Sequence, residues 1–135
     1  MATSLLLPDS SFYITCARQN IDPFTEIAAR AADAELTTCG VVVAEVTRGR
    51  RDPHVLRRFQ AAFAVMIYLP TTNAVWERVA QLAWSLDREG TVLQLPDLII
   101  AATALEADAT VLTFDAHFKK IPGLRVTDHP GPTSV

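Results

Sequence analysis

The sequence predicts one α/β domain, spanning residues 1–135, with a parallel sheet that helices cover on both faces. Short, nearly continuous apolar runs alternate with amphipathic segments, as expected for strands that are buried on both sides. Asp-Pro pairs mark the starts of helices between these runs. With 135 residues, 50% of them hydrophobic and 20% charged, the chain can close a single core, and a second domain would not fit.

The first half of the chain predicts one strand and three helices. Residues 4–7 form an apolar run that Pro8 ends, which predicts a buried strand, and residues 10–17 predict a helix. Two more helices begin with an aspartate N-cap followed by proline, at residues 22–23 and 52–53. Their apolar faces consist of Phe24, Ile27, Ala28 and Ala31 in the earlier helix, and Val55, Leu56, Phe59 and Phe63 in the later one.

The segment at residues 39–46 is compatible with two structures. Its valines, residues 41–43, favour a strand by propensity, whereas residues 44–48 can continue a helix. The residues alone leave both alternatives open.

The second half alternates in the same way. Residues 65–69 predict a buried strand that Pro70 ends, and Thr71 or Thr72 caps the following helix. That helix has apolar positions at Val75, Val79, Leu82 and Leu86. The remaining expected elements are a helix at residues 97–107 with Pro96 in its first turn, a fully buried strand at 110–114, a weak strand at 125–127 and a loose tail at 128–135.

Composition indicates a cytoplasmic protein. The longest apolar stretches, residues 41–44 and 98–102, fall far short of the roughly 18 residues of a membrane-spanning helix, and residues 1–8 have no basic start. No membrane partner is expected. Cys16 and Cys39 lack CxxC spacing and a nearby histidine cluster, so we expect two reduced thiols in or near the core.

Four carboxylates, Asp9, Glu45, Asp97 and Asp115, stand among apolar residues. Acids in such surroundings are costly to bury unless they are paired, protonated or bound to a cation. Asp9 and Asp115 directly follow apolar strand runs, where parallel sheets bind ligands, and Asp97 at a helix start can point the same way. Taken singly, the aspartates could be helix caps, but capping does not account for Glu45 among its valines. The set therefore predicts a metal site, and oxygen ligands suit Mg²⁺.

Basic residues are concentrated in one segment. The net charge of −3 argues against an overall basic nucleic-acid binder. Five of the twelve basic residues nevertheless lie between positions 48 and 58, namely Arg48, Arg50, Arg51, Arg57 and Arg58. This cluster could follow a phosphate backbone, with Arg48, Arg50 and Arg51 as candidate RNA contacts, or it could be a solvated helix face or a contact for an acidic partner.

Four sequence motifs together resemble the PIN domain, and more closely the VapC-type toxins of toxin–antitoxin pairs. The resemblance covers nearly the whole chain, and the motif that begins at Asp97 is its most specific part. The motifs are Asp9-Ser10-Ser11 followed by Ile14; Ala44-Glu45-Val46 with Gly49; Asp97-Leu98-Ile99-Ile100-Ala101-Ala102-Thr103-Ala104; and Thr113-Phe114-Asp115-Ala116-His117-Phe118 followed by Ile121-Pro122-Gly123. Two departures are Pro8 directly before the first acid and Phe114, where the family often has a basic residue.

The resemblance implies a three-layer α/β/α fold with a five-stranded parallel sheet of order 3-2-1-4-5, in which residues 39–48 form a helix. It further implies a Mg²⁺- or Mn²⁺-dependent endoribonuclease, usually a homodimer, that a small antitoxin protein inhibits. Asp9, Asp97 and Asp115 would bind the metal, and Glu45 would be a ligand or the base that orients water. Two hydroxyl residues, Ser10 and Thr113, would support these ligands, although simple hydrogen bonding at strand ends explains them equally well.

Two other classes of function stay open. A phosphotransferase could use Asp9 as its nucleophile, but Ser11 stands where the haloacid-dehalogenase pattern has a second aspartate. The stronger alternative is a PIN-fold binding module with little catalytic activity, which acts through a protein partner or by tethering RNA. Outside the site, we expect His117 in a surface turn, and Trp76 and Trp84 in core or dimer packing rather than stacked on bases.

Overall fold

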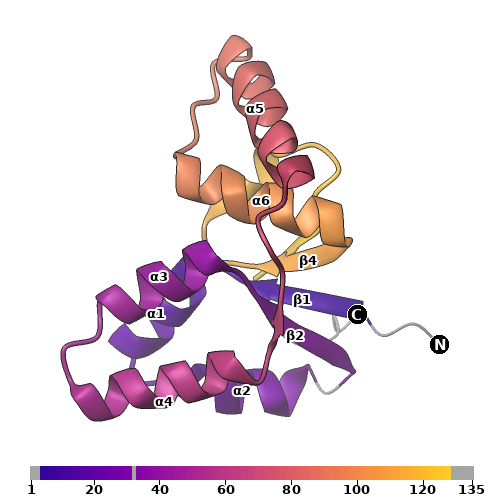
Figure 1. Ribbon diagram of the computed structural model, residues 1–135. Coiled ribbons are helices and arrows are strands. Elements are labelled where there is room, and N and C mark those ends of the chain that lie inside the picture. Colours follow the sequence, from indigo (N-terminus) through magenta and orange to yellow (C-terminus); the bar gives the residue numbers. More distant parts are fainter. Residues whose placement is uncertain (1–3, 32, 129–135) are drawn as a thin grey trace.

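The computed structural model describes residues 4–31 and 33–128 and contains a five-stranded, all-parallel sheet (Figure 1). The spatial order of the strands is β3-β2-β1-β4-β5, as the resemblance implied. The strands are β1 (Ser4–Pro8), β2 (Ala34–Thr38), β3 (Ile67–Tyr68), β4 (Ala109–Leu112) and β5 (Val126–Thr127). The helices are α1 (Ser10–Arg18), α2 (Pro23–Arg30), α3 (Gly40–Arg48), α4 (Pro53–Ala64), α5 (Asn73–Arg88) and α6 (Leu95–Ala107), and a short 3-10 helix, η1 (Ala116–Lys120), follows β4.

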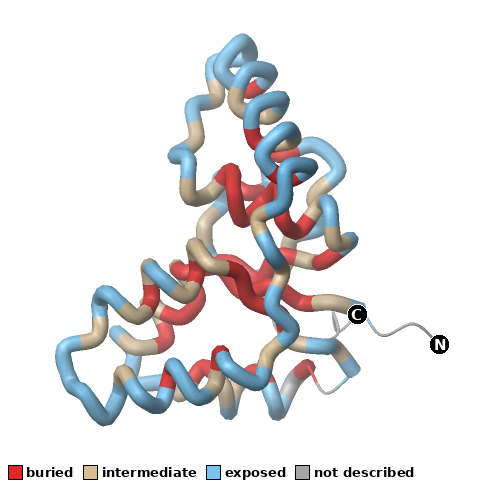
Figure 2. Tube along the Cα trace, viewed as in Figure 1, coloured by how far each residue is buried: buried red, intermediate tan, exposed pale blue. Residues whose placement is uncertain are grey.

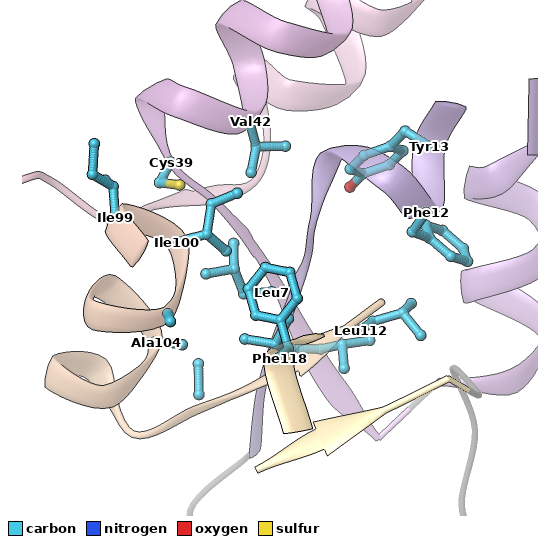
Figure 3. Packing of buried hydrophobic residues seen from close by; sticks show 14 of the residues in the cluster. Leu7, Phe12, Tyr13, Cys39, Val42, Ile99, Ile100, Ala104, Leu112 and Phe118 are labelled. Atoms are coloured by element: carbon cyan, nitrogen blue, oxygen red, sulfur yellow. The ribbon is translucent and has the colours of Figure 1, made fainter. Parts of the chain in front are cut away.

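Helices cover both faces of the sheet. Figure 1 shows α1 to α4 on one side and α5 and α6 on the other, which confirms the three-layer arrangement. The most buried helix is α6, in which every residue from Leu98 to Ala104 is buried. Figure 2 shows this burial concentrated at the sheet and at the helical segments facing it. In Figure 3, Leu7 of β1 lies among Ile100, Leu112 and Phe118, so the core joins the central strands to α6 and η1.

Proline at position 8 does not disturb the central strand. Pro8 is the last residue of β1 and pairs with Leu112 of β4. Proline has no N–H to give to the ladder, but the N–H of Asp9 donates to the carbonyl of Leu112 at 2.9 Å. The chain therefore stays in register up to Asp9, which fixes the first acid at the end of the strand.

One strand was not predicted from the residues, and the burial of another was predicted wrongly. The residues did not predict β2, because Ala34–Thr38 contains one large apolar side chain and two threonines. The side chain of Thr37 is fully buried and donates to the carbonyl of Leu6 at 2.9 Å, so its polar group is satisfied inside the sheet. The predicted buried strand at 65–69 is only the exposed edge strand β3, because α4 continues to Ala64.

Other predictions have mixed outcomes. Residues 39–48, ambiguous from composition, form the helix α3 with Cys39 as its N-cap. Both cysteines are buried and free. Of the two alternatives for the tryptophans, core packing was wrong, since Trp76 and Trp84 are 47% and 63% exposed on α5, and dimer packing stays a prediction. Within residues 4–31 and 33–128 no helix is long and apolar enough to cross a membrane. Nearly all of the predicted tail, residues 129–135, lies outside the described residues.

Candidate active site

All four predicted carboxylates lie toward the carboxyl ends of the central strands. Asp9 follows β1 and is the N-cap of α1, while Asp115 follows β4 and is the N-cap of η1. The two strands are neighbours in the sheet, so these two acids start close together. Asp97 occupies the first turn of α6 and Glu45 lies within α3. Because α3 packs against both α1 and α6, it carries Glu45 to the same edge.

Asp9 is the most enclosed of the four acids. It is only 2% exposed, and both of its oxygens accept hydrogen bonds. Its Oδ1 accepts the N–H of Phe12 at 3.0 Å, and its Oδ2 accepts the hydroxyl of Thr113 at 2.6 Å. The Ser11 hydroxyl lies 2.8 and 2.9 Å from the two oxygens. Asp9 is therefore a helix cap, as one alternative held, and is also clamped by two hydroxyls from separate segments.

Hydroxyl groups also connect the other acids. Ser10 donates to Oε1 of Glu45 at 2.6 Å, which ties α1 to α3. The N–H of Asp115 donates to the Thr113 hydroxyl at 2.9 Å, and Oδ1 of Asp115 lies 2.7 Å from Nδ1 of His117. Ser10 and Thr113 thus contact the acids that they were predicted to support.

Asp97 differs from the other three acids because its carboxylate accepts no hydrogen bond from the residues at 4–31 and 33–128. Burial and, after it, the negative charges of Asp115, Asp9 and Glu45 together raise its pKa from 3.8 to about 6, while His117 opposes this effect. The charges of all four acids therefore act at one place. Asp97 is the acid whose negative charge has the least compensation from the protein.

Burial and a neighbouring negative charge also act on the pKa of Asp9. Burial raises the pKa of Asp9 above its ordinary value, and the charge of Asp115 adds to the increase. The hydrogen bonds from Thr113, Phe12 and Ser11 favour the ionised form and therefore oppose this increase in the pKa. A cation near these carboxylates would lower both pKa values, since opposite charge favours the ionised form.

The donor set fits a small, hard cation by its chemistry. Carboxylate and hydroxyl oxygens are the ligands that Mg²⁺ prefers, and Mg²⁺ keeps several waters while taking only one or two carboxylates directly. Among the described residues, no three His, Cys, Asp or Glu side chains converge closely enough to hold an ion together. The arrangement thus suits an ion held by one or two acids, with the others reaching it through water.

Comparison with protein families assigns the fold. The model of the PIN domain family matches residues 6–124. The chain belongs to the PIN domain family. All four acids fall within the matched residues, so the predicted resemblance is confirmed over the whole candidate site.

This PIN domain is similar to characterised and solved relatives. It is 27% identical over 132 residues to ribonuclease VapC21 of Mycobacterium tuberculosis, covering 92% of this chain and 90% of the relative. The structure of VapBC2 from Rickettsia felis bound to a promoter DNA fragment superimposes with a TM-score of 0.77 at 18% identity, covering 91% of this chain and 97% of that one. A toxin-antitoxin complex from Klebsiella pneumoniae gives a TM-score of 0.70 at 22% identity, covering 95% and 99%. These structural similarities show the fold.

The arginines of the predicted cluster have different surroundings in this PIN domain. Arg58 forms an ion pair with Asp22, and the guanidinium of Arg50 lies 5.7 Å from the ring centroid of Phe59. Arg48 and Arg51 are exposed and make no ion pair with the described residues. Arg48 lies three residues after Glu45 on α3, and therefore near the same helix face as that acid.

Sequence reasoning missed two contributors to the site. Ser11 was considered as part of the Asp9-Ser10-Ser11 motif and as the place of a missing aspartate, but not as a contact of the acids. Its hydroxyl contacts Asp9 and lies 3.2 Å from the hydroxyl of Thr113. Phe12 was not considered, although its N–H donates to Asp9. The signal for both was available, because the residues two and three places after an N-cap are those whose groups reach its side chain. His117 has an exposed side chain at the surface, as predicted, but it is paired with Asp115.

Proposed function

We propose that this PIN domain is a metal-dependent endoribonuclease that hydrolyses RNA phosphodiester bonds as the toxin of a toxin–antitoxin pair. The proposal is carried by the four carboxylates at the carboxyl ends of β1 and β4, whose charges act on one another in a partly desolvated site. Phosphodiester hydrolysis uses such oxygens to hold a divalent cation against the phosphate. The similarity to a ribonuclease over most of both chains supports RNA as the substrate.

Each acid has a role in this proposal. Asp9, Asp97 and Asp115 bind Mg²⁺ or Mn²⁺, one or two of them directly and the others through water, and Glu45 is a further ligand or accepts the proton of the attacking water. A divalent cation in such a site lowers the pKa of a bound water and stabilises charge on the leaving oxygen. Ser10 holds one oxygen of Glu45 by its 2.6 Å hydrogen bond, which leaves the second oxygen for a water.

Two groups around the acids position them. The hydroxyls of Thr113 and Ser11 both contact Asp9, so they fix the orientation of a carboxylate that the fold has buried. Rigid support of this kind keeps ligands within the small range of geometries that a metal site needs. Arg48, exposed near the α3 face that carries Glu45, and Arg51, exposed just after this helix, are the better candidates for phosphate contacts, because Arg50 packs on Phe59.

A small antitoxin protein is the proposed physiological partner, and a homodimer the proposed assembly. The similarity to a toxin-antitoxin complex along almost the whole of both chains supports the antitoxin. An antitoxin that reached the carboxylates would meet a net negative site, and we therefore expect it to present a basic side chain there.

The test is cleavage of a mixed cellular RNA pool by the purified protein, freed of any partner. We expect discrete cut ends with Mg²⁺ or Mn²⁺ and none with a chelator. Asp9→Asn should abolish cleavage, because the amide lacks the charge that binds a cation. The variant should still fold, since asparagine is an equally good N-cap and the neighbouring hydroxyls can reverse their hydrogen bonds.

Asp52→Asn is the matched control. Asp52 is also a helix N-cap, its Oδ1 accepts the N–H of His54 at 2.8 Å, and it is exposed at the start of α4. The same chemical change there should leave cleavage intact. Metal binding without any cleavage of RNA would contradict the nuclease and favour the binding module. A covalent phosphate on Asp9 would instead identify a phosphotransferase.

A further inference from the structure

Phe114 is an exposed aromatic side chain inside the catalytic sequence segment. It is 49% exposed, although the residue before it and the residue after it both belong to the candidate site. Thr113 donates to Asp9, and Asp115 raises the pKa of Asp97. The chain therefore presents a large apolar ring to solvent between Thr113, whose hydroxyl contacts Asp9, and Asp115, which is itself one of the four acids.

The backbone around Phe114 is held firmly. The N–H of Thr113 donates to the carbonyl of Thr127 at 2.9 Å, and the N–H of Asp115 donates to the Thr113 hydroxyl at 2.9 Å. Asp115 then caps η1. These bonds fix the residues on both sides of Phe114, so the position of its backbone relative to the acids is set by the fold.

The ring itself is supported from one side. Its centroid lies 5.6 Å from that of Phe12, with the two planes inclined by 35°. Phe12 is only 1% exposed and donates its N–H to Asp9. One residue therefore both donates a hydrogen bond to the buried acid and supports the exposed ring. Such support lowers the entropy lost when a ligand stacks on the ring.

We propose that Phe114 is a stacking platform for the nucleobase next to the scissile phosphodiester, and that it contributes to the choice of cleavage site. This inference rests on the proposed endoribonuclease function. Unpaired bases of single-stranded RNA stack on aromatic side chains, and this stacking tolerates different bases because every base has a π-face. A phenyl ring has no hydrogen-bonding group, so the preference it gives follows stacking strength, with purines favoured over pyrimidines.

The test combines base-specific fluorescence with cleavage. A single-stranded RNA carrying one 2-aminopurine is titrated into protein with the Asp97→Asn substitution, which prevents cutting. We expect quenching of the 2-aminopurine when it occupies the position beside the scissile bond. Adding Phe114→Ala should remove the quenching and weaken binding about ten- to a hundred-fold, which is the usual loss when a stacking aromatic is truncated.

Three comparison variants separate stacking from packing. Phe114→Tyr keeps the π-face and should keep both the quenching and the affinity. Phe114→Leu keeps apolar contact with Phe12 but has no π-face, so it should behave like Phe114→Ala. Trp84→Ala removes an aromatic side chain that is 63% exposed on α5, where Arg88 lies over its ring, and should change neither measurement.

The possible outcomes distinguish a failure of the stacking role of Phe114 from a failure of the proposed nuclease function. If the otherwise wild-type protein cuts RNA and Phe114→Ala leaves the rate and the distribution of cut sites unchanged, the inference is overturned while the nuclease stands. If no RNA is cut but quenching still depends on Phe114, the nuclease fails, and with it the role in choosing a cleavage site, while the stacking of a base on Phe114 stands. Loss of antitoxin binding alone in Phe114→Ala, with RNA binding retained, would assign the ring to the protein partner and overturn the inference.

Discussion

Asp97→Asn should abolish cleavage and yet stabilise the metal-free protein at neutral pH. In the folded protein, burial and three neighbouring acids raise the pKa of Asp97 from 3.8 to about 6. The fold therefore penalises its ionised form. Below the ordinary pKa, Asp97 is protonated in both the folded and unfolded states and contributes nothing. Stability is lost as the pH rises through the window between the two values, and the full penalty applies above it.

The size of this stabilisation follows from the pKa shift of Asp97. Two pKa units correspond to about 3 kcal/mol, and because Asp97 is partly exposed and screened by solvent we take about half, roughly 1.5 kcal/mol. Asparagine carries no charge and escapes this penalty. The variant should therefore have a higher free energy of unfolding than the wild type near neutral pH, and the difference should shrink as the pH falls toward the ordinary pKa of aspartate.

Urea unfolding followed by circular dichroism in a chelating buffer measures this difference at about pH 7.5 and about pH 4. Adding Mg²⁺ should reverse the order, because an ion that binds only the folded state stabilises the protein in proportion to its affinity, and the wild type has the additional ligand. A variant less stable than the wild type near pH 7.5, or a gain that does not change with pH, would refute the electrostatic reasoning. Equal stabilisation of both proteins by Mg²⁺ would remove Asp97 from the metal site.

Two further substitutions test the surroundings of the site. Thr113→Val should destabilise the fold by about 1–3 kcal/mol in urea unfolding, because it leaves a buried oxygen of Asp9 without its 2.6 Å donor. Thr25→Val removes the same kind of donor from the carboxylate of Asp22, which is more exposed than that of Asp9, and should cost less than about 0.5 kcal/mol. Equal losses would contradict the burial argument. Gly40→Ala should change the stability of the fold by less than about 1 kcal/mol. The new Cβ would lie 3.0 Å from the hydroxyl of Tyr68, but this side chain is exposed and can turn away. Alanine also favours a helix more than glycine does. A larger loss in thermal unfolding would show that Tyr68 is held in place.

The positions of the acids could be predicted because they depend on local sequence patterns. Apolar runs ending at Asp9 and just before Asp115 place these residues at strand ends, and the parallel sheet brings the strand ends to one edge. The Asp97 helix could be predicted from Pro96 and its apolar body. Glu45 could be placed only through the family resemblance, since its helix begins with residues that favour a strand by propensity.

Strand β2 could not be predicted, because its burial depends on a distant partner. Thr37 is a poor indicator of a buried strand until its hydroxyl finds the carbonyl of Leu6, 31 residues earlier in the chain. The opposite error occurred at β3, where an apolar run proved to be an exposed edge. Tertiary pairing decides both cases, so a pattern read along the sequence cannot determine them.

The competing interpretations of the acids, helix cap or metal ligand, are not alternatives for Asp9 and Asp115. Both cap a helix in the structure, because any acid that ends a strand before a helix meets free N–H groups. A capping carboxylate is already oriented and partly neutralised, so capping prepares it to bind a cation rather than competing with that role. The evidence for a cation therefore depends most on Asp97, which caps nothing through its side chain, accepts no hydrogen bond from the described residues and has a raised pKa. An acid in this state costs the fold stability, and binding a cation is the function that would offset this cost.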